Sequence, residues 1–72
     1  MPNFITFHFD TGFSIYGFRH NDGWGIDISG VLPDIERAFI KVYGNKRFKR
    51  IYDIITFVRN FTEAKLIKVE IS

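Results

Sequence analysis

Two histidines and several nearby aspartates are the residues of this sequence best suited to metal or acid–base chemistry. His8 and His20 lie in the same region as Asp10, Asp22 and Asp27, and imidazole and carboxylate groups serve both as metal ligands and as proton carriers. A metal site needs three or four convergent ligands with a supporting outer layer of hydrogen bonds. Two histidines, with carboxylates mostly in turn sequences, fall short of that. We therefore predict strand histidines without a catalytic or metal-binding role, for which a pH-sensitive interface is the remaining function.

A short motif near the N-terminus resembles the signature of the aspartic proteases, in which two aspartates share a proton and activate water. The motif is Asp10-Thr11-Gly12, preceded by the apolar Phe9, and a homodimer would supply the pair. The sequence departs from the family pattern at Phe13, where a small or hydroxyl residue normally follows. Since Asp and Gly are also favoured in hairpin turns, we predict a turn here. The chain shows no nucleophile elbow, P-loop, dinucleotide-binding turn or zinc spacing, so we expect neither an enzyme nor a bound cofactor or metal.

Positive charge is concentrated between residues 37 and 52, a stretch that contains no acidic residue. Its six basic residues are Arg37, Lys41, Lys46, Arg47, Lys49 and Arg50. Clustered positive charge strengthens binding to a phosphate backbone, because binding releases counterions. It also speeds association with an acidic protein surface. We predict that the last five of these residues bind a partner. The alternative is a solvated corner that only keeps the domain soluble.

Large apolar residues near the N-terminus alternate in a way that fills both faces of a sheet. One set, which includes Ile5, Phe7 and Ile15, can cover a core, and a second set then needs its own cover. The second set is predicted to be Phe4, Tyr16, Phe18 and Trp24. Three kinds of cover are consistent with the sequence: the chain's own helix and last strand, a second copy or protein partner, or unpaired bases stacked on the rings.

The elements that must carry these residues begin with three predicted strands. Alternation runs from Asn3 to Phe9 and from Phe13 to Arg19, so the intervening turn predicts a hairpin in which Phe4 faces Phe18. Asn21-Asp22-Gly23 predicts a second hairpin, with a strand from Trp24 to Ser29. A two-residue and a three-residue loop differ by one step of register, which moves Trp24 to the opposite face. The sequence leaves that choice open.

Two helices and a last strand follow in the pattern. Pro33 and the acidic residues after it predict a helix start, and Gly44 its C-terminal cap. Apolar spacing predicts a longer helix over 46–61 with Asn45 as its cap, and alternation over 64–71 predicts a strand. The fold is therefore predicted to be α+β in the order β-β-β-α-α-β, an antiparallel sheet of about four strands packed on two helices. The last strand can lie beside the first inside the sheet, at an edge, or in a second copy, and its lysines suit an edge.

The length and composition of the chain limit the classes of function that we expect. The 72 residues predict a single domain spanning 1–72 with little core to spare, without cysteine and with a net charge of +2. No signal-peptide pattern or membrane span is evident, so we expect a cytoplasmic protein with no membrane partner. We predict a small non-enzymatic protein that acts by protein–protein contact, as a regulator or inhibitor encoded by a phage or mobile element, with a homodimer as one arrangement. The alternative is a nucleic-acid-binding protein that uses the basic stretch 37–52 and an aromatic sheet face.

Overall fold

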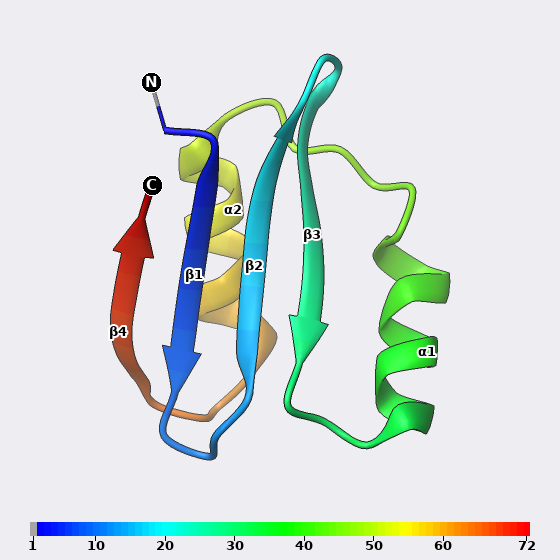
Figure 1. Ribbon diagram of the computed structural model, residues 1–72, viewed down its shortest axis with the longest axis vertical. Helices are drawn as coiled ribbons and strands as arrows, with labels where there is room; N and C mark the ends of the chain where they lie inside the picture. The colour runs from blue at the N-terminus through cyan, green and yellow to red at the C-terminus, as the bar shows by residue number, and fades with distance from the viewer. Residues whose placement is uncertain (1) are drawn as a thin grey trace.

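A computed structural model describes residues 2–72 as one antiparallel sheet with two helices (Figure 1). The elements are β1 (Phe4–Phe9), β2 (Ser14–His20), β3 (Gly23–Ser29), α1 (Pro33–Tyr43), α2 (Ile51–Phe61) and β4 (Leu66–Ile71). The strands lie in the order β3-β2-β1-β4. The predicted α+β fold and its β-β-β-α-α-β order are confirmed.

The first hairpin has the predicted register, with Phe4 opposite Phe18 and Phe7 opposite Ile15. Its turn uses Gly12 at a φ of +92°, a conformation that glycine adopts without steric cost. Asp10 ties this turn to the chain before β4, because the Lys65 N–H donates to Asp10 Oδ1 at 3.2 Å and the Asp10 N–H donates to the Lys65 carbonyl at 2.9 Å. The predicted turn role of Asp10 is therefore confirmed.

The second hairpin has the two-residue loop, Asn21-Asp22, which places Trp24 opposite Arg19 and His20 opposite Gly23. This register turns Trp24 toward the helices, where only 6% of its surface is exposed. The prediction that Trp24 shares a face with Phe4, Tyr16 and Phe18 was therefore wrong. The sequence could not decide the loop length, and one step of register changes the face of every side chain in the strand.

The helix α2 lies across the side of the sheet that carries the core residues of β1 to β3. Its Ile54 and Val58 are 0% and 1% exposed, and Ile54 lies over Gly17 of β2. A Cβ at Gly17 would stand 3.3 Å from Ile54 Cδ1, so the glycine permits this close approach. The helix α1 flanks β3 and joins α2 through ring contacts such as Phe39 with Phe61, whose centroids are 5.5 Å apart (Figure 1).

The second helix is shorter than predicted, because it begins at Ile51 rather than near Lys46. Residues 46–50 instead form a non-helical connection beside the start of β3, where the Trp24 N–H donates to the Phe48 carbonyl at 2.7 Å and the Phe48 N–H donates to the Trp24 carbonyl at 2.9 Å. These two bonds satisfy backbone groups of Trp24 that β2 cannot reach, and they hold Phe48 out of a helix. Asn45 is therefore not a helix cap, and Arg50 occupies that position. Gly44 is the C-cap of α1, as predicted.

The last strand lies at an edge, paired with β1 alone, so this choice among the three placements is settled. Ile5 faces Ile71 and Phe7 faces Val69, with a register irregularity between His8 and Phe9. Opposed residues of an antiparallel pair point to the same face. Val69 and Ile71 therefore point toward the helix side, yet they remain exposed.

Candidate binding site

The predicted partner-binding residues fall into two groups. Lys41 lies on α1 and is exposed, whereas the other four lie on the extended connection before α2. Arg47 is the least available of these, because its Nε donates to Asp22 Oδ1 at 3.1 Å and its Nη1 donates to the carbonyl of Lys46 at 3.0 Å. Only 27% of the Arg47 side chain is exposed. Arg47 therefore joins the connection to the β2–β3 hairpin and is poorly placed to bind a partner.

Arg50 is largely exposed to solvent, with 81% of its side-chain surface accessible. Its backbone N–H donates to Asp53 Oδ2 at 3.3 Å, which places an acidic residue in the first turn of α2. Lys46, Arg47 and Lys49 precede α2, and Asp53 supplies the negative charge that a helix N-terminus prefers.

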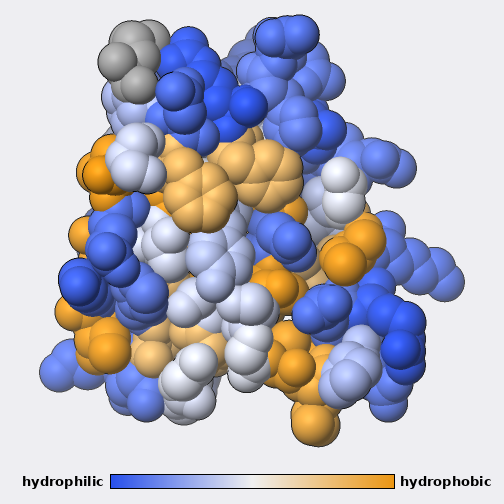
Figure 2. All heavy atoms as spheres, in the orientation of Figure 1, coloured by the Kyte–Doolittle hydropathy of each residue, from blue (hydrophilic) through white to orange (hydrophobic). Residues whose placement is uncertain are grey.

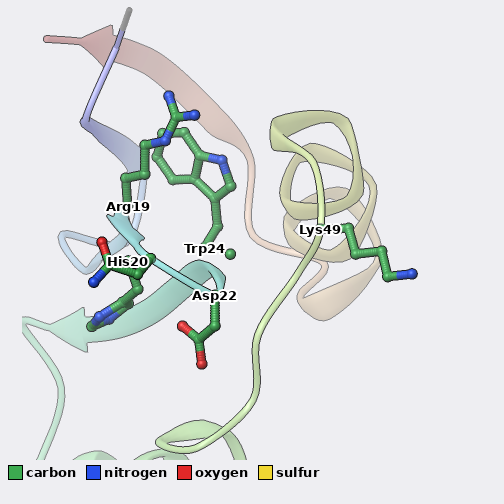
Figure 3. Close-up of a pocket in the computed structure, with 7 residues that line it drawn as sticks. Arg19, His20, Asp22, Trp24 and Lys49 are labelled. Carbon is green, nitrogen blue, oxygen red and sulfur yellow. The ribbon is translucent and has the colours of Figure 1, made fainter.

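The connection brings Lys49 and Arg50 close to two residues of the second hairpin. Arg19 and Trp24 line both an open depression of about 520 Å³ that reaches Lys49 and an adjoining one of about 400 Å³ that reaches Arg50 and Tyr52. We call these five residues the cationic groove. Figure 3 shows the Arg19 side chain beside the Trp24 indole, with Lys49 extending away into solvent. The groove lies on the helix side of the sheet, since Arg19 and Trp24 are opposed residues there.

Arg19 is the residue of the candidate site that the sequence analysis missed. It stands outside the basic stretch, and only the two-residue loop places it opposite Trp24. The one signal in the sequence is the spacing between Arg19 and Trp24. With a two-residue loop these residues are partners and their side chains share a face, whereas with a three-residue loop the side chains lie on opposite faces.

The groove has a surplus of positive charge. Within residues 2–72, no carboxylate lies within 4.0 Å of the Arg19 or Lys49 side-chain nitrogens. Asp22, which also lines the depression that reaches Lys49, pairs with Arg47 at 3.1 Å, and Asp53 pairs with Arg50 of the groove at 4.0 Å. A partner with carboxylate or phosphate groups would therefore find donors that the fold itself does not use.

The opposite face of the sheet carries the remaining aromatic set. Phe4, Tyr16 and Phe18 share this face, as predicted, and Figure 2 shows rings gathered over the upper part of the sheet. Phe4 is 39% exposed and stacks on Tyr16 with centroids 5.7 Å apart. No helix of the described chain covers them, so the alternative of cover by the second helix and last strand was wrong (Figure 1).

This aromatic face is partly closed by its own neighbours. The Tyr16 hydroxyl bonds to Ser29 Oγ at 2.6 Å, and Phe18 packs edge-on to His20 at 5.0 Å. Gly25 makes room for both rings, because a Cβ there would lie 2.9 Å from His20 Nε2 and 3.1 Å from Phe18 Cε2. The apolar surface that remains for a partner is centred on Phe4.

The histidines do not form a site together. His8 bonds to Glu70 Oε1 at 2.5 Å and lies opposite Ser14, at the far end of β2 from His20. His20 follows Ser14 by six steps along the strand, which is roughly 20 Å. Over the described residues, no group of three or more His, Cys, Asp or Glu side chains could hold a metal ion. None of the helices found in residues 2–72 has the length and apolar character needed to cross a membrane.

Comparisons with known proteins give no relative for this chain. No family model matches it, and neither the curated proteins nor the solved structures contain a significant match.

Proposed function

We propose that this chain is a small non-enzymatic binding protein that occupies an acidic surface of a protein partner through its cationic groove. The observation that carries the proposal is the placement of Arg19, Lys49 and Arg50 around Trp24 and Tyr52, with no carboxylate paired to Arg19 or Lys49 within residues 2–72. Arginine and large aromatic residues contribute most of the binding energy at many interfaces. Tyr52 is 70% exposed, so its ring offers a contact surface beside the charges.

An acidic peptide segment fits this groove chemically. The guanidinium groups of Arg19 and Arg50 suit carboxylates, because their donors form paired hydrogen bonds with both oxygens. Lys49 adds a mobile positive charge at the rim, where it speeds association more than it adds affinity. A regulator or inhibitor of this kind acts by covering the surface that it binds.

Nucleic-acid binding is less well supported as the alternative. That function was expected to combine phosphate contacts from the basic stretch with base stacking on the aromatic sheet face. The cationic groove lies on the helix side of the sheet, whereas Phe4, Tyr16 and Phe18 lie on the other side. One strand of nucleic acid would have to pass around the edge of the sheet to use both surfaces.

The intrinsic fluorescence of Trp24, the only tryptophan, provides a direct binding assay because the residue lines the groove. A glutamate-rich peptide and a single-stranded oligonucleotide are titrated separately at two salt concentrations. We expect the peptide to bind, with an affinity that Arg19→Glu and Lys49→Glu each reduce about tenfold or more. Lys65→Glu is the matched control, since it makes the same charge change on an exposed residue outside the groove.

Two results would contradict the proposal. One is the absence of peptide binding even at low ionic strength. The other is an equal loss of affinity for Lys65→Glu and Arg19→Glu, which would mean that overall charge rather than the groove drives binding. Tight, steeply salt-dependent binding of the oligonucleotide alone would favour the nucleic-acid function instead.

A further inference from the structure

The two edges of the sheet differ: other parts of the chain lie along the β3 edge, whereas the β4 edge has no neighbouring strand within residues 2–72. At the β3 edge, Phe48 pairs with Trp24 and α1 lies alongside. At the other edge, β4 pairs with β1 on its inner side, and within residues 2–72 no strand pairs with its outer side (Figure 1). An open edge of this kind presents unpaired N–H and C=O groups that can pair with another strand.

The open edge is also apolar on its helix side. Val69 and Ile71 point to that side and are 45% and 62% exposed, and Ile67, at the register irregularity of β4, is 60% exposed. Figure 2 shows hydrophobic atoms along this margin, interrupted by hydrophilic ones. Three exposed aliphatic residues of one strand thus lie along an edge whose outward backbone groups have no partner within residues 2–72.

The hydrogen-bond pattern fixes which backbone groups face outward. Phe4 and Ser72 exchange two bonds, from the Phe4 N–H at 2.9 Å and from the Ser72 N–H at 2.8 Å. Bonded and non-bonded pairs alternate along an antiparallel ladder, so Glu70 bonds toward β1 whereas Val69 and Ile71 direct their N–H and C=O groups away from it. A strand that joins this edge must therefore bond to Val69 and Ile71.

The charges around Val69 are self-complementary. Lys68 and Glu70 flank it and lie on the same face as each other, opposite to its side chain. In an antiparallel pair of two β4 strands centred on Val69, Lys68 of each copy faces Glu70 of the other. The same register places Ile67 of one copy opposite Ile71 of the other, so aliphatic residues are opposed at both ends of the pair.

We propose that two copies of this chain associate through β4, antiparallel and centred on Val69, so that two four-stranded sheets become one continuous sheet. The adjacent registers that keep the same backbone bonding place Lys68 opposite Lys68 or Glu70 opposite Glu70. Like charges directly opposite each other destabilise a strand pair. Charge therefore selects the register centred on Val69, and the two-fold axis at Val69 makes each contact occur twice.

Charge reversal tests both the edge and the register. Lys68→Glu places two pairs of glutamates across the interface and Glu70→Lys two pairs of lysines, so we expect each variant to dimerise at least roughly tenfold more weakly than the parent chain in sedimentation equilibrium. A mixture of the two variants restores opposite charges at every pair. We expect it to form a heterodimer, and the double variant Lys68→Glu/Glu70→Lys to regain the homodimer.

A second variant tests whether the backbone hydrogen bonds of Val69 join the two copies. Val69→Pro removes an N–H that faces outward, which an edge strand tolerates, so we expect a folded monomer by circular dichroism. Val69→Ile is its control, because it keeps the N–H and the β-branched side chain and should remain dimeric. A parent chain that stays monomeric at millimolar concentration would overturn the proposal. So would a dimer that Val69→Pro leaves intact, or one for which mixing the charge variants restores nothing.

Discussion

At the scale of single residues, the fold depends on a few positions where a side chain of the wrong size cannot fit. Ile54 and its neighbour Ile55 show the contrast: Ile54 is 0% exposed over Gly17, whereas Ile55 is only half-buried. Replacing a fully buried isoleucine with alanine costs about 2 to 5 kcal/mol, and the cost falls where solvent or neighbours can fill the space.

We expect Ile54→Ala to lower the free energy of unfolding by an amount within that range, and Ile55→Ala to lower it by clearly less. Urea denaturation of both variants measures the difference. Equal losses would mean that the two residues share the same degree of burial.

Gly12 and Gly23 both have a positive φ, but only Gly23 is also in close contact with another part of the chain. Gly12 (φ +92°) has no atom within 4 Å of an added Cβ, whereas at Gly23 (φ +134°) that Cβ would lie 2.6 Å from the Phe48 carbonyl oxygen. Alanine at either position adopts a disfavoured conformation that costs about 1 to 3 kcal/mol.

Gly23→Ala must in addition displace the connection that pairs with Trp24. We therefore expect Gly23→Ala to be the more destabilising of the two variants, and to change the fluorescence of Trp24 in the folded state, whereas Gly12→Ala leaves that fluorescence unchanged. An identical stability and spectrum for both would show that the contact with Phe48 does not form.

At the scale of elements, the sequence predicted what depends on local pattern and missed what depends on distant contacts. The first hairpin and α1 follow from turn residues, alternation and Pro33, all of which act within a few residues. The start of α2 does not, because Phe48 leaves the helical pattern to pair with Trp24, which lies a third of the chain earlier in the sequence. In the candidate site, Lys49 and Arg50 were predicted from charge density, whereas Arg19 joins them only through a loop length that the sequence left open.

The connection between the helices leads to a prediction at this scale, because two of its basic residues, Arg47 and Lys49, differ in their contacts. Arg47 is held by Asp22 and by backbone carbonyls, whereas Lys49 has no ion pair among the described residues. Exposed ion pairs contribute about 0 to 1 kcal/mol, and a glutamate at position 47 would also repel Asp22.

We expect Arg47→Glu to lower the thermal unfolding temperature measurably and Lys49→Glu to leave it nearly unchanged. Thermal melts followed by circular dichroism compare the two at equal ionic strength. A loss of stability for Lys49→Glu as large as that for Arg47→Glu would contradict the assignment of Lys49 to binding rather than to the fold.

At the scale of the whole molecule, a chain of 72 residues buries a smaller share of its surface than larger domains do, about 60%. Its radius of gyration over Cα atoms is 11.6 Å, close to the roughly 11 Å expected of a compact chain of this length. The single copy is therefore fully collapsed, yet it leaves three aliphatic residues of β4 in solvent. Association through that edge would bury apolar surface that the chain cannot cover alone.

Such association links stability to concentration, since a second copy that binds only the folded chain stabilises it by mass action. We expect the unfolding temperature of the parent chain to rise with protein concentration, and that of Val69→Pro to remain constant over the same range. Differential scanning calorimetry at several concentrations measures both. An unfolding temperature of the parent chain that does not change with concentration would show that the edge adds no stability through a second copy, while the cationic groove and its predicted acidic partner would be unaffected by that result.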